Sequence, residues 1–425
     1  MARDNDIPNR KMKALDEAGL SLQRLEKIEE MEDYLKLVRR IWNQETGVDT
    51  LAKKLIDYHP KMTLSNIYVI KDKGEMVSTL NLIPVTWEIG GIPLKVAEMG
   101  HVGTLPEYRG RGLIRRLVGE FHKDVERQGY DLAVIEGIPY FYRQFGYEYS
   151  IPLLEETRIR LDYIPKYETK VNIRRLTEKD VPLAMDLLER AQSKFHVRTV
   201  RSKTIWMVQH KTSIASDPEP FEAYAAEERG RLVAYFRIRK MSKEKELLLT
   251  EISEVDQVAA EAVLDFLKDY GIRENLETLS ANVSYEEPFS KFLVCLGGVR
   301  RVPTYAWQIR ITDYVGIFHK LKRMLEKRLS NSPHYRLTET LNFNFRMFTI
   351  RVTVKKGRII DIQKIQTSER SPIGLNPLAF IQLLTGYKNR EELEATYPDV
   401  RIALSHRYLI DILFPKLPSY VHSAY

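Results

Sequence analysis

The sequence predicts a mixed α+β protein in which one fold occurs twice in tandem and a third α+β unit follows. The chain has 425 residues, which is too long for one hydrophobic core and indicates two or three domains. Strand-like and helix-like segments appear in the same order in residues 21–162 and 171–310. We therefore expect two mixed, mostly antiparallel sheets with covering helices, and a third unit over residues 311–425.

The first unit is read from hydrophobic periodicity and turn signals. Its expected elements are a strand at 20–25, helices at 30–42 and 48–57, strands at 67–70, 77–87 and 94–102, a helix ending near Arg127, a strand at 132–136 and a short helical segment before Tyr147. The helices have Leu, Ile and Val at helical spacing. Gly90 and Gly91 are typical of the tight turn that joins two antiparallel strands.

A glycine-containing turn joins the strand at 94–102 to the helix that follows it. The turn reads Arg109-Gly110-Arg111-Gly112-Leu113-Ile114. The first amides of a helix have no intrahelical partner and lie at the positive end of the helix dipole, so they attract anions. Glycine lets a phosphate approach the main chain because it has no Cβ. A dinucleotide-binding G-x-G-x-x-G motif and a P-loop motif are both absent, so the turn predicts a pyrophosphate site of another kind.

The second unit repeats the element order but lacks this turn. Its expected elements are strands at 171–176, 221–226, 232–238, 247–252 and 276–283 and helices at 180–191 and 258–269. Asp256-Gln257-Val258-Ala259-Ala260-Glu261 occupies the position of the glycine turn. Because Asp256 and Glu261 would repel a phosphate, we expect the second unit to have a structural role.

The third unit is predicted from an amphipathic helix, alternating strands and a capped helix. We expect a helix at 318–329, strands at 341–353 and 359–365, and a helix that opens at Asn376-Pro377 and ends at Gly386. The last 13 residues, 413–425, hold prolines and aromatic residues and are expected to dock in a groove rather than fray.

Composition argues against several functional classes. The formal charge is +8, but lysine and arginine alternate with glutamate in many polar segments, which favours a solvated surface over nucleic-acid binding. No apolar run approaches the roughly 18 residues of a membrane span. The first residues are charged and lack an apolar h-region, which argues against secretion, and the one cysteine, Cys295, lies in an apolar run where a buried structural thiol is expected. A cytoplasmic protein without a metal site is predicted.

Two motifs and the element order carry a resemblance to a known family. The turn at 109–114 resembles the acetyl-coenzyme A loop Gln/Arg-x-x-Gly-x-Gly/Ala of the GCN5-related N-acetyltransferases (GNAT), with Ile114 where glycine or alanine is usual. Tyr142-Arg143-Gln144-Phe145-Gly146-Tyr147 is similar to their Tyr-x-x-Phe-Gly-Tyr stretch. With Leu413-Phe414-Pro415 ahead of an aromatic C-terminus, nearly the whole chain resembles the enhanced intracellular survival (Eis) family of bacterial N-acetyltransferases.

This resemblance implies a catalytic GNAT domain at 21–162, a GNAT-like domain without a cofactor loop at 171–310 and a sterol-carrier-protein-like (SCP2-like) domain at 311–425. Residues 1–20 have no counterpart and are expected to be an extension. The family also implies a homo-oligomer, commonly a hexamer.

The resemblance further implies which residues act. Acetyl-coenzyme A would be bound by the main chain of His101, Val102 and Gly103, by Arg109, Gly110, Arg111, Gly112, Leu113 and Ile114 at the pyrophosphate, and by Glu136 and Gly137. Tyr142 matches the family's proton donor to the thiolate. The terminal carboxylate of Tyr425 matches its proton acceptor. Trp42, Trp87 and Phe141 are candidates for an acceptor pocket or for the core.

The predicted function is transfer of an acetyl group from acetyl-coenzyme A to an amine by direct attack. Polyamine-like or aminoglycoside-like small molecules and lysine side chains are the acceptors that the resemblance implies. Two alternatives remain from the sequence. One is a lipid-binding or small-ligand-binding protein with an inactive acetyltransferase domain, and the other is a sensor that binds acetyl-coenzyme A without turnover.

Overall fold

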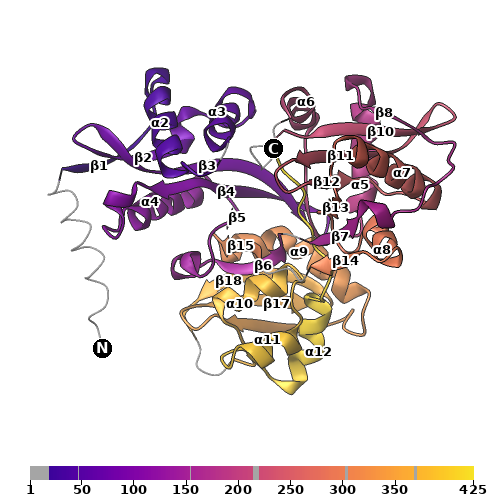
Figure 1. Ribbon diagram of the computed structural model, residues 1–425. Helices are drawn as coiled ribbons and strands as arrows, with labels where there is room; N and C mark the ends of the chain where they lie inside the picture. The colour runs from indigo at the N-terminus through magenta and orange to yellow at the C-terminus, as the bar shows by residue number, and fades with distance from the viewer. Residues whose placement is uncertain (1–18, 46, 154, 214–219, 302–304, 368–370) are drawn as a thin grey trace. The chain divides into compact units, whose positions relative to one another are not determined.

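The computed structural model describes residues 19–45, 47–153, 155–213, 220–301, 305–367 and 371–425 (Figure 1). The expected extension at 1–20 therefore lies outside the described residues, except for its last two. Contacts divide the chain into two compact units. The first holds the described parts of Met1–Thr86, Leu94–Tyr147 and Ile309–Tyr314, and the second those of Trp87–Pro93, Glu148–Gln308 and Val315–Tyr425.

The first unit has the elements expected from the sequence. They are β1 (Leu20–Arg24), α2 (Met31–Ile41), α3 (Val48–Tyr58), β2 (Ile67–Asp72), β3 (Glu75–Ile89), β4 (Ile92–Thr104), α4 (Leu113–Arg127), β5 (Leu132–Ile135) and the 3-10 helix η4 (Phe141–Phe145). The strands lie in the order β1-β2-β3-β4-β5 and continue to β15 (Ala306–Ile311). Neighbours are antiparallel from β1 to β3, whereas β4 and β5 are parallel.

The parallel pairing of β4 with β5 covers only part of β4. Val96, Ala97 and Glu98 of β4 pair with residues 132–134 of β5. Beyond that point β4 continues to Thr104, while β5 ends at Ile135. The described pairing thus leaves the last residues of β4, up to Thr104, without a β5 partner.

Helix α4 is held by one apolar stripe and one buried carboxylate. Leu113, Leu117, Val118, Phe121 and Val125 are buried, at the spacing of one helix face. Asp124, also buried, forms an ion pair with Arg24 of β1 and accepts a hydrogen bond of 2.6 Å from the Tyr68 hydroxyl of β2. These contacts fix the helix axis and therefore the position of its N-terminus.

The second unit begins with a sheet that repeats the first topology. Its elements include β7 (Glu156–Arg160), β8 (Asn172–Arg175), α5 (Val181–Gln192), β9 (Val197–Thr199), α6 (Lys203–Thr212), β10 (Glu222–Glu228), β11 (Arg231–Met241), β12 (Glu246–Ile252), α7 (Gln257–Arg273), β13 (Thr278–Ala281), α8 (Pro288–Cys295) and β14 (Val299–Arg301). The strand order is β14-β7-β13-β12-β11-β10-β8. As in β4-α4-β5, the helix α7 connects two parallel strands, β12 and β13.

Strand pairing departs from the sequence-based boundaries in two places. Strand β7, placed by the sequence in the first unit, pairs with β13 and β14 of the second sheet. Strand β15, placed in the second unit, joins the first sheet. Sequence order alone misses this exchange because a short strand can pair with any open sheet edge.

A second sheet of the same unit has the order β18-β17-β16-β19-β20. Its elements are α9 (Tyr314–Ser330), β16 (Glu339–Asn344), β17 (Thr349–Lys355), β18 (Arg358–Ile365), β19 (Ile373–Gly374), α10 (Pro377–Leu384), α11 (Arg390–Thr396), β20 (Arg401–Ile402) and α12 (Leu404–Leu413). Aromatic rings from three of its helices and from β16 meet in the core, where Phe380 stacks on Phe318 with centroids 5.7 Å apart and Phe343 and Phe414 pack beside them.

One strand predicted in this part is wrong. Residues 341–353 form two strands, because the chain turns at 345–348, where the Phe345 amide donates to the Phe348 carbonyl at 2.8 Å. The turn contains Arg346 at φ 69°, a left-handed conformation that glycine or asparagine usually signals. The expected helix at 377 is confirmed, and the Asn376 side chain caps it by accepting from the Leu378 amide.

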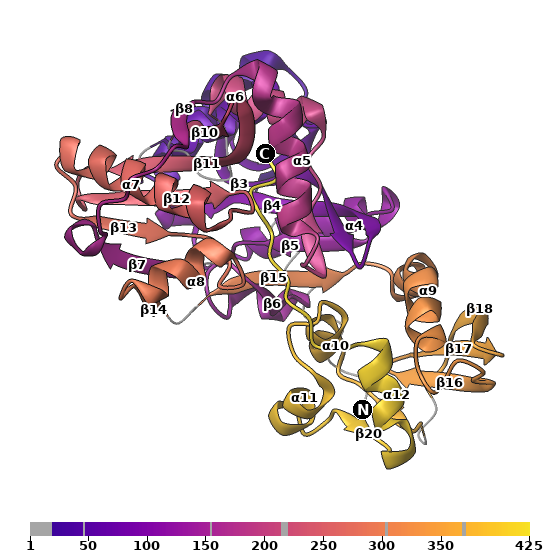
Figure 2. The ribbon, with the colours of Figure 1, turned by 90° about the vertical axis from the view of Figure 1, so that its right-hand side faces the viewer.

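The C-terminal tail is docked within the second unit, as the sequence predicts. Figure 2 shows it leaving α12 as an extended chain. The Tyr420 amide donates to the Val197 carbonyl at 3.0 Å, and the Thr199 hydroxyl donates to the His422 carbonyl at 2.6 Å. The Tyr425 side chain is 4% exposed. A terminal segment held by main-chain hydrogen bonds on β9 has a defined path rather than a frayed end.

The expectation of a buried Cys295 is wrong, because its side chain is exposed. Helix α8 is short and buries the face that carries Phe289, Ser290 and Leu293, so Cys295 faces outward at its last position. Within the described parts of the chain, the helices are too short or too polar to cross a bilayer.

Candidate active site

The glycine turn leaves the N-terminus of α4 open. Gly112 is the N-cap residue at φ 81°, and Gly110 has φ 76°. Both are in the left-handed region, which only glycine adopts at little cost. No atom lies within 4 Å of the point where a Cβ would stand on either residue. Because glycine has no side chain to cap the helix, the first amides of α4 face open space.

Arginines surround this helix end without carboxylate partners. In the described chain, no carboxylate lies within ion-pair distance of Arg109, Arg111 or Arg115, all of which are near the turn. Arg109 Nε donates to the Thr104 carbonyl at 3.3 Å, and Arg111 Nη2 donates to the Glu107 carbonyl at 3.2 Å. Arg115 donates to the Gln144 side-chain oxygen. Neutral acceptors orient these guanidinium groups and leave their positive charge available to an anion.

In the duplicated unit, a side-chain carboxylate caps the corresponding helix N-terminus. Its helix α7 begins after Asp256, whose carboxylate accepts a hydrogen bond of 2.8 Å from the Ala259 amide. That carboxylate satisfies one of the amides an anion would use and repels any other negative charge. The two helix ends therefore differ in one essential respect: the first can receive an external anion, and the second carries its own.

A cavity of about 720 Å³ lies beside the open helix end. It is lined by residues from α2, the end of β4, the glycine turn, the start of α4 and η4, namely Ile41, Trp42, Glu45, Val102, Gly103, Thr104, Tyr108, Arg109, Gly110, Gly112, Leu113, Ile114, Arg115, Ile138, Phe141, Tyr142, Gln144 and Phe145. All belong to the first unit. The cavity thus joins the anion site to an aromatic region in which Tyr142 lies.

Most of the predicted site residues line this cavity. Those that do are Val102, Gly103, Arg109, Gly110, Gly112, Leu113, Ile114 and Tyr142. His101, Arg111, Glu136 and Gly137 are not among the lining residues, and Tyr425 belongs to the second unit. Of the aromatic candidates, Trp42 and Phe141 line the cavity. Trp87 is a core residue, 1% exposed, with its ring centroid 5.2 Å from that of Trp307.

His101 lies in β4 just before Val102 and Gly103, which line the cavity. It has φ 46°, a strained value for a residue with a side chain, although β4 continues through it to Thr104. Asn81 Nδ2 donates to its Nδ1 at 3.2 Å, so its Nε2 is the donor to the Val48 carbonyl at 3.3 Å. Burial lowers the His101 pKa to about 4, which agrees with a neutral ring in this network.

Glycine at 103 and 137 makes room for two aromatic rings. A Cβ on Gly103 would stand 2.8 Å from the Trp42 ring, and a Cβ on Gly137 would stand 2.2 Å from Cε2 of Tyr142. Gly137 follows β5 and lies close against the Tyr142 ring. Its predicted contact with the cofactor stays a prediction, while its contact with Tyr142 is direct.

Tyr142 is held in an aromatic cluster. Its side chain is 5% exposed, and its ring packs edge-on against Phe141 and Tyr147 with centroids 5.0 and 6.2 Å away. Tyr140, which precedes η4, has φ 63° and sets the start of that short helix. A ring fixed on several sides presents its hydroxyl in one direction, as a proton donor requires.

The sequence analysis missed Glu45, Tyr108, Arg115 and Gln144. Arg115 comes directly after the glycine turn, in the first turn of α4. The cluster of arginines at this helix start was a signal that could have identified it. The Tyr108 hydroxyl donates to Asp72 at 2.8 Å, so it anchors the turn to β2. Glu45 lies in no motif and follows the end of α2, whereas Gln144 occupies a variable position of the stretch at 142–147 and lies in η4.

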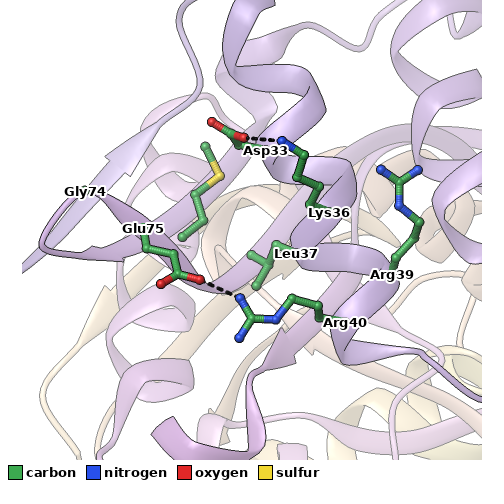
Figure 3. Close-up of a pocket in the computed structure, with 8 residues that line it drawn as sticks. Asp33, Lys36, Leu37, Arg39, Arg40, Gly74 and Glu75 are labelled. Atoms are coloured by element: carbon green, nitrogen blue, oxygen red, sulfur yellow. Dashed lines mark hydrogen bonds and ion pairs between the residues drawn. The ribbon is translucent and has the colours of Figure 1, made fainter.

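A second cavity in the first unit, of about 460 Å³, is a weaker candidate (Figure 3). It lies between α2 and the β2–β3 turn, and its charged side chains are already paired. Asp33 accepts from Lys36 at 3.1 Å, and Glu75 accepts from Arg40 at 2.5 Å. Exposed pairs of this kind are typical of a solvated surface. Among the described residues, no group of three or more His, Cys, Asp or Glu could hold a metal ion.

The acetyltransferase (GNAT) domain profile matches residues 23–150, which contain the whole cavity lining. No curated protein sequence matches the chain. Residues 23–150 therefore form a GNAT acetyltransferase domain, and this domain supports acetyltransferase activity.

Solved structures share the fold over nearly the whole chain. A GCN5-related N-acetyltransferase from Anabaena variabilis has a TM-score of 0.72 at 16% identity and covers 96% of this chain and 100% of its own. A probable N-acyltransferase from Enterococcus faecalis has a TM-score of 0.69 at 18% identity, covering 96% and 100%. Eis1 from Mycobacterium abscessus has a TM-score of 0.65 at 15% identity, covering 95% and 100%. The multidomain GNAT-like fold is thus shared.

The His101 network predicts a specific loss of stability in acid. The folded pKa of about 4 lies below the ordinary value of about 6.5, so between these values the unfolded chain binds more protons. The stabilisation is complete above pH 6.5 and is lost as the pH falls towards 4. His101→Asn, which tolerates a left-handed backbone, should lower the Tm at pH 7.5 but flatten its decline between pH 6.5 and 4. Parallel Tm curves for the two proteins would contradict this role.

Proposed function

We propose that this acetyltransferase domain moves an acetyl group from acetyl-coenzyme A to an amine, as an enzyme of the Eis type. The main observation behind this proposal is the uncapped N-terminus of α4. Arginines without carboxylate partners lie around it, and it opens into the cavity that Tyr142 lines. A pyrophosphate needs main-chain donors and positive charge at one place, and this helix end offers both.

The cofactor would lie along the cavity with its diphosphate at the turn. Gly110, Gly112, Leu113 and Ile114 supply main-chain donors there, and Arg109 and Arg111 supply charge. The β4–β5 pairing ends at Glu98, and main-chain groups at residues 101–103 would bind the pantetheine arm and the thioester. Glu136 and Gly137, at the end of β5, are proposed to touch the same arm. These assignments rest on the open geometry together with the motif.

The reaction needs two proton transfers and no covalent enzyme intermediate. An amine is protonated near pH 7 and attacks only after it loses a proton. Its nitrogen then forms a bond to the acetyl carbon, and the carbon–sulfur bond breaks with the electron pair leaving on sulfur. We assign Tyr142 to protonate this thiolate. Main-chain N–H groups at residues 101–103 of β4 would stabilise the negative charge on the acetyl oxygen.

The proton from the amine is assigned to the carboxylate of Tyr425. Support for this step comes from the ordered path of residues 418–425 on β9 and from the family pattern of an aromatic C-terminus. A carboxylate at the end of a tail with a defined path can act as a base, whereas one on a frayed end cannot be positioned.

Acetyl transfer is tested by following thiol release with acetyl-coenzyme A and a panel of polyamines, aminoglycosides and lysine peptides. Gly112→Asp should weaken coenzyme A binding at least about tenfold, because its carboxylate caps α4 as Asp256 caps α7. Isothermal titration measures the affinity. Gly119→Asp is the matched control, since it adds the same charge to an exposed position of α4. Equal affinities for the two variants would remove the turn from the pyrophosphate site.

Tyr142→Phe should lower kcat by about 10²-fold and leave coenzyme A affinity unchanged, because only the donated proton is lost. Tyr108→Phe is the matched control. It removes another hydroxyl from the cavity lining, but one that is bonded to Asp72. A kcat for Tyr142→Phe equal to that of Tyr108→Phe would exclude Tyr142 as the acid.

Deletion of Tyr425, or extension by one glycine, should lower kcat by about 10²-fold at neutral pH with coenzyme A binding intact. Tyr425→Phe keeps the terminal carboxylate and should keep most of the activity. If the deletion variant retains full activity, the carboxylate is not the base, and the transferase assignment stands without it.

A further inference from the structure

A cavity of about 570 Å³ lies wholly within the second unit, and one of its lining residues, Gly90, comes from the turn between β3 and β4. Its walls come from the loop after α5, the last turns of α9, the helix α12 and the chain that follows α12. Lys194, His196, Lys327 and Arg328 line it together with apolar side chains that include Met324 and Pro415.

Arg328 is the unusual member of this lining. Its Nη1 donates to the Leu413 carbonyl at 2.6 Å, and its Nη2 lies 3.5 Å from Nδ1 of His196. His196 Nε2 lies 3.1 Å from the Leu384 carbonyl, which makes Nε2 the protonated nitrogen and Nδ1 the acceptor for Arg328. Both partners of the guanidinium are therefore neutral.

No carboxylate of the described chain compensates this charge. Burial alone lowers the Arg328 pKa to about 10, with no acidic group acting against it. Other partly buried arginines of the same unit are paired, as Arg198 is with Glu88 at 3.0 Å. The carbonyls at the end of α9 supply only a partial negative charge. A desolvated guanidinium without a counter-ion is costly, so a full negative charge is missing from this place.

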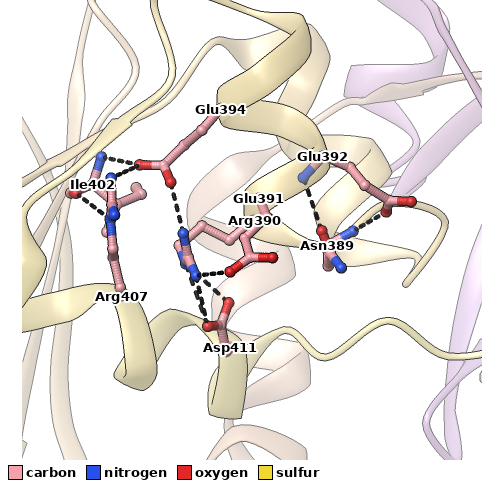
Figure 4. Close-up of polar contacts among 8 residues, drawn as sticks. All are labelled: Asn389, Arg390, Glu391, Glu392, Glu394, Ile402, Arg407 and Asp411. Atoms are coloured by element: carbon pink, nitrogen blue, oxygen red, sulfur yellow. Dashed lines mark hydrogen bonds and ion pairs between the residues drawn. The ribbon is translucent and has the colours of Figure 1, made fainter.

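The one carboxylate that lines the cavity is already used. Asp411 accepts from Arg390 Nε at 3.1 Å and from Arg390 Nη2 at 3.1 Å (Figure 4). Lys194 is likewise paired, with Glu287 at 2.7 Å. In the described chain Lys327 has no ion pair, is exposed and neighbours Arg328 at the end of α9. Arg328 and Lys327 thus give the cavity its net positive charge.

We propose that this cavity binds a small organic anion, a carboxylate or phosphate monoester whose oxygens are held by Arg328 and Lys327 and whose body packs on the apolar wall. Guanidinium groups suit both kinds of oxyanion because their N–H donors match two oxygens at once. Pro415 and Leu417 also line the cavity, so an occupant would rest against the chain that follows α12.

The test uses the full-length protein with phenyl phosphate, benzoate and inorganic phosphate at constant ionic strength. Isothermal titration gives the affinity, and the Tm shift gives a second reading that does not depend on acetyl transfer. Arg328→Met removes the charge at similar volume, and Lys327→Met removes the exposed one without touching the core. Arg323→Met, on an exposed position of α9 outside the cavity, is the matched control.

The proposal expects phenyl phosphate or benzoate to bind the unaltered protein and raise its Tm. Affinity should fall about tenfold or more in Arg328→Met, several-fold in Lys327→Met and not at all in Arg323→Met. Binding of inorganic phosphate alone, with the same variant pattern, would support an anion site and overturn the apolar contribution. Absence of binding, or equal affinity in all the variants, would overturn the proposal. Should Arg328→Met fail to fold, the comparison of Lys327→Met with Arg323→Met decides.

Discussion

The exposed first turn of α4 is the constraint on which the rest of the acetyltransferase domain depends. A helix end that keeps its amides unsatisfied has to be stabilised elsewhere, and here the Asp124 contacts with Arg24 and Tyr68 and the apolar stripe of α4 hold the helix in place. Two left-handed glycines then turn the chain without a capping side chain. His101 has a strained left-handed backbone, and the β4–β5 pairing ends at Glu98, before the residues of β4 that line the cavity.

The duplicated fold shows how little is needed to remove this chemistry. Both copies place a helix between two parallel strands. In the second copy one carboxylate, Asp256, stands in place of the glycine turn and caps the helix by accepting a hydrogen bond from a first-turn amide. The second copy instead contributes β9, on which the C-terminal tail lies. A single position at a helix start thus separates a ligand site from a structural element.

Local signals predicted most of this architecture, and long-range pairing accounts for what they missed. Periodicity and glycine turns placed the strands and helices of the first sheet, and the motif at 109–114 placed the helix end. The exchange of β7 and β15 between sheets has no local signature. The turn at Arg346 was missed because an arginine rarely adopts φ 69°.

In the site, Val102 and Tyr142 were predicted to lie in the cavity, whereas Glu45 and Gln144 are brought there by helices that end nearby. Apolar sequence around Cys295 suggested burial, but a short helix exposes one of its faces.

The central claim is that main-chain donors at the start of α4 hold the diphosphate of acetyl-coenzyme A. A crystal structure of the full-length protein with coenzyme A tests it most directly. The account predicts diphosphate oxygens within hydrogen-bond distance of the amides of residues 110–115, with the pantetheine arm running towards Tyr142. Coenzyme A bound elsewhere, or a turn closed by its own side chains, would contradict it.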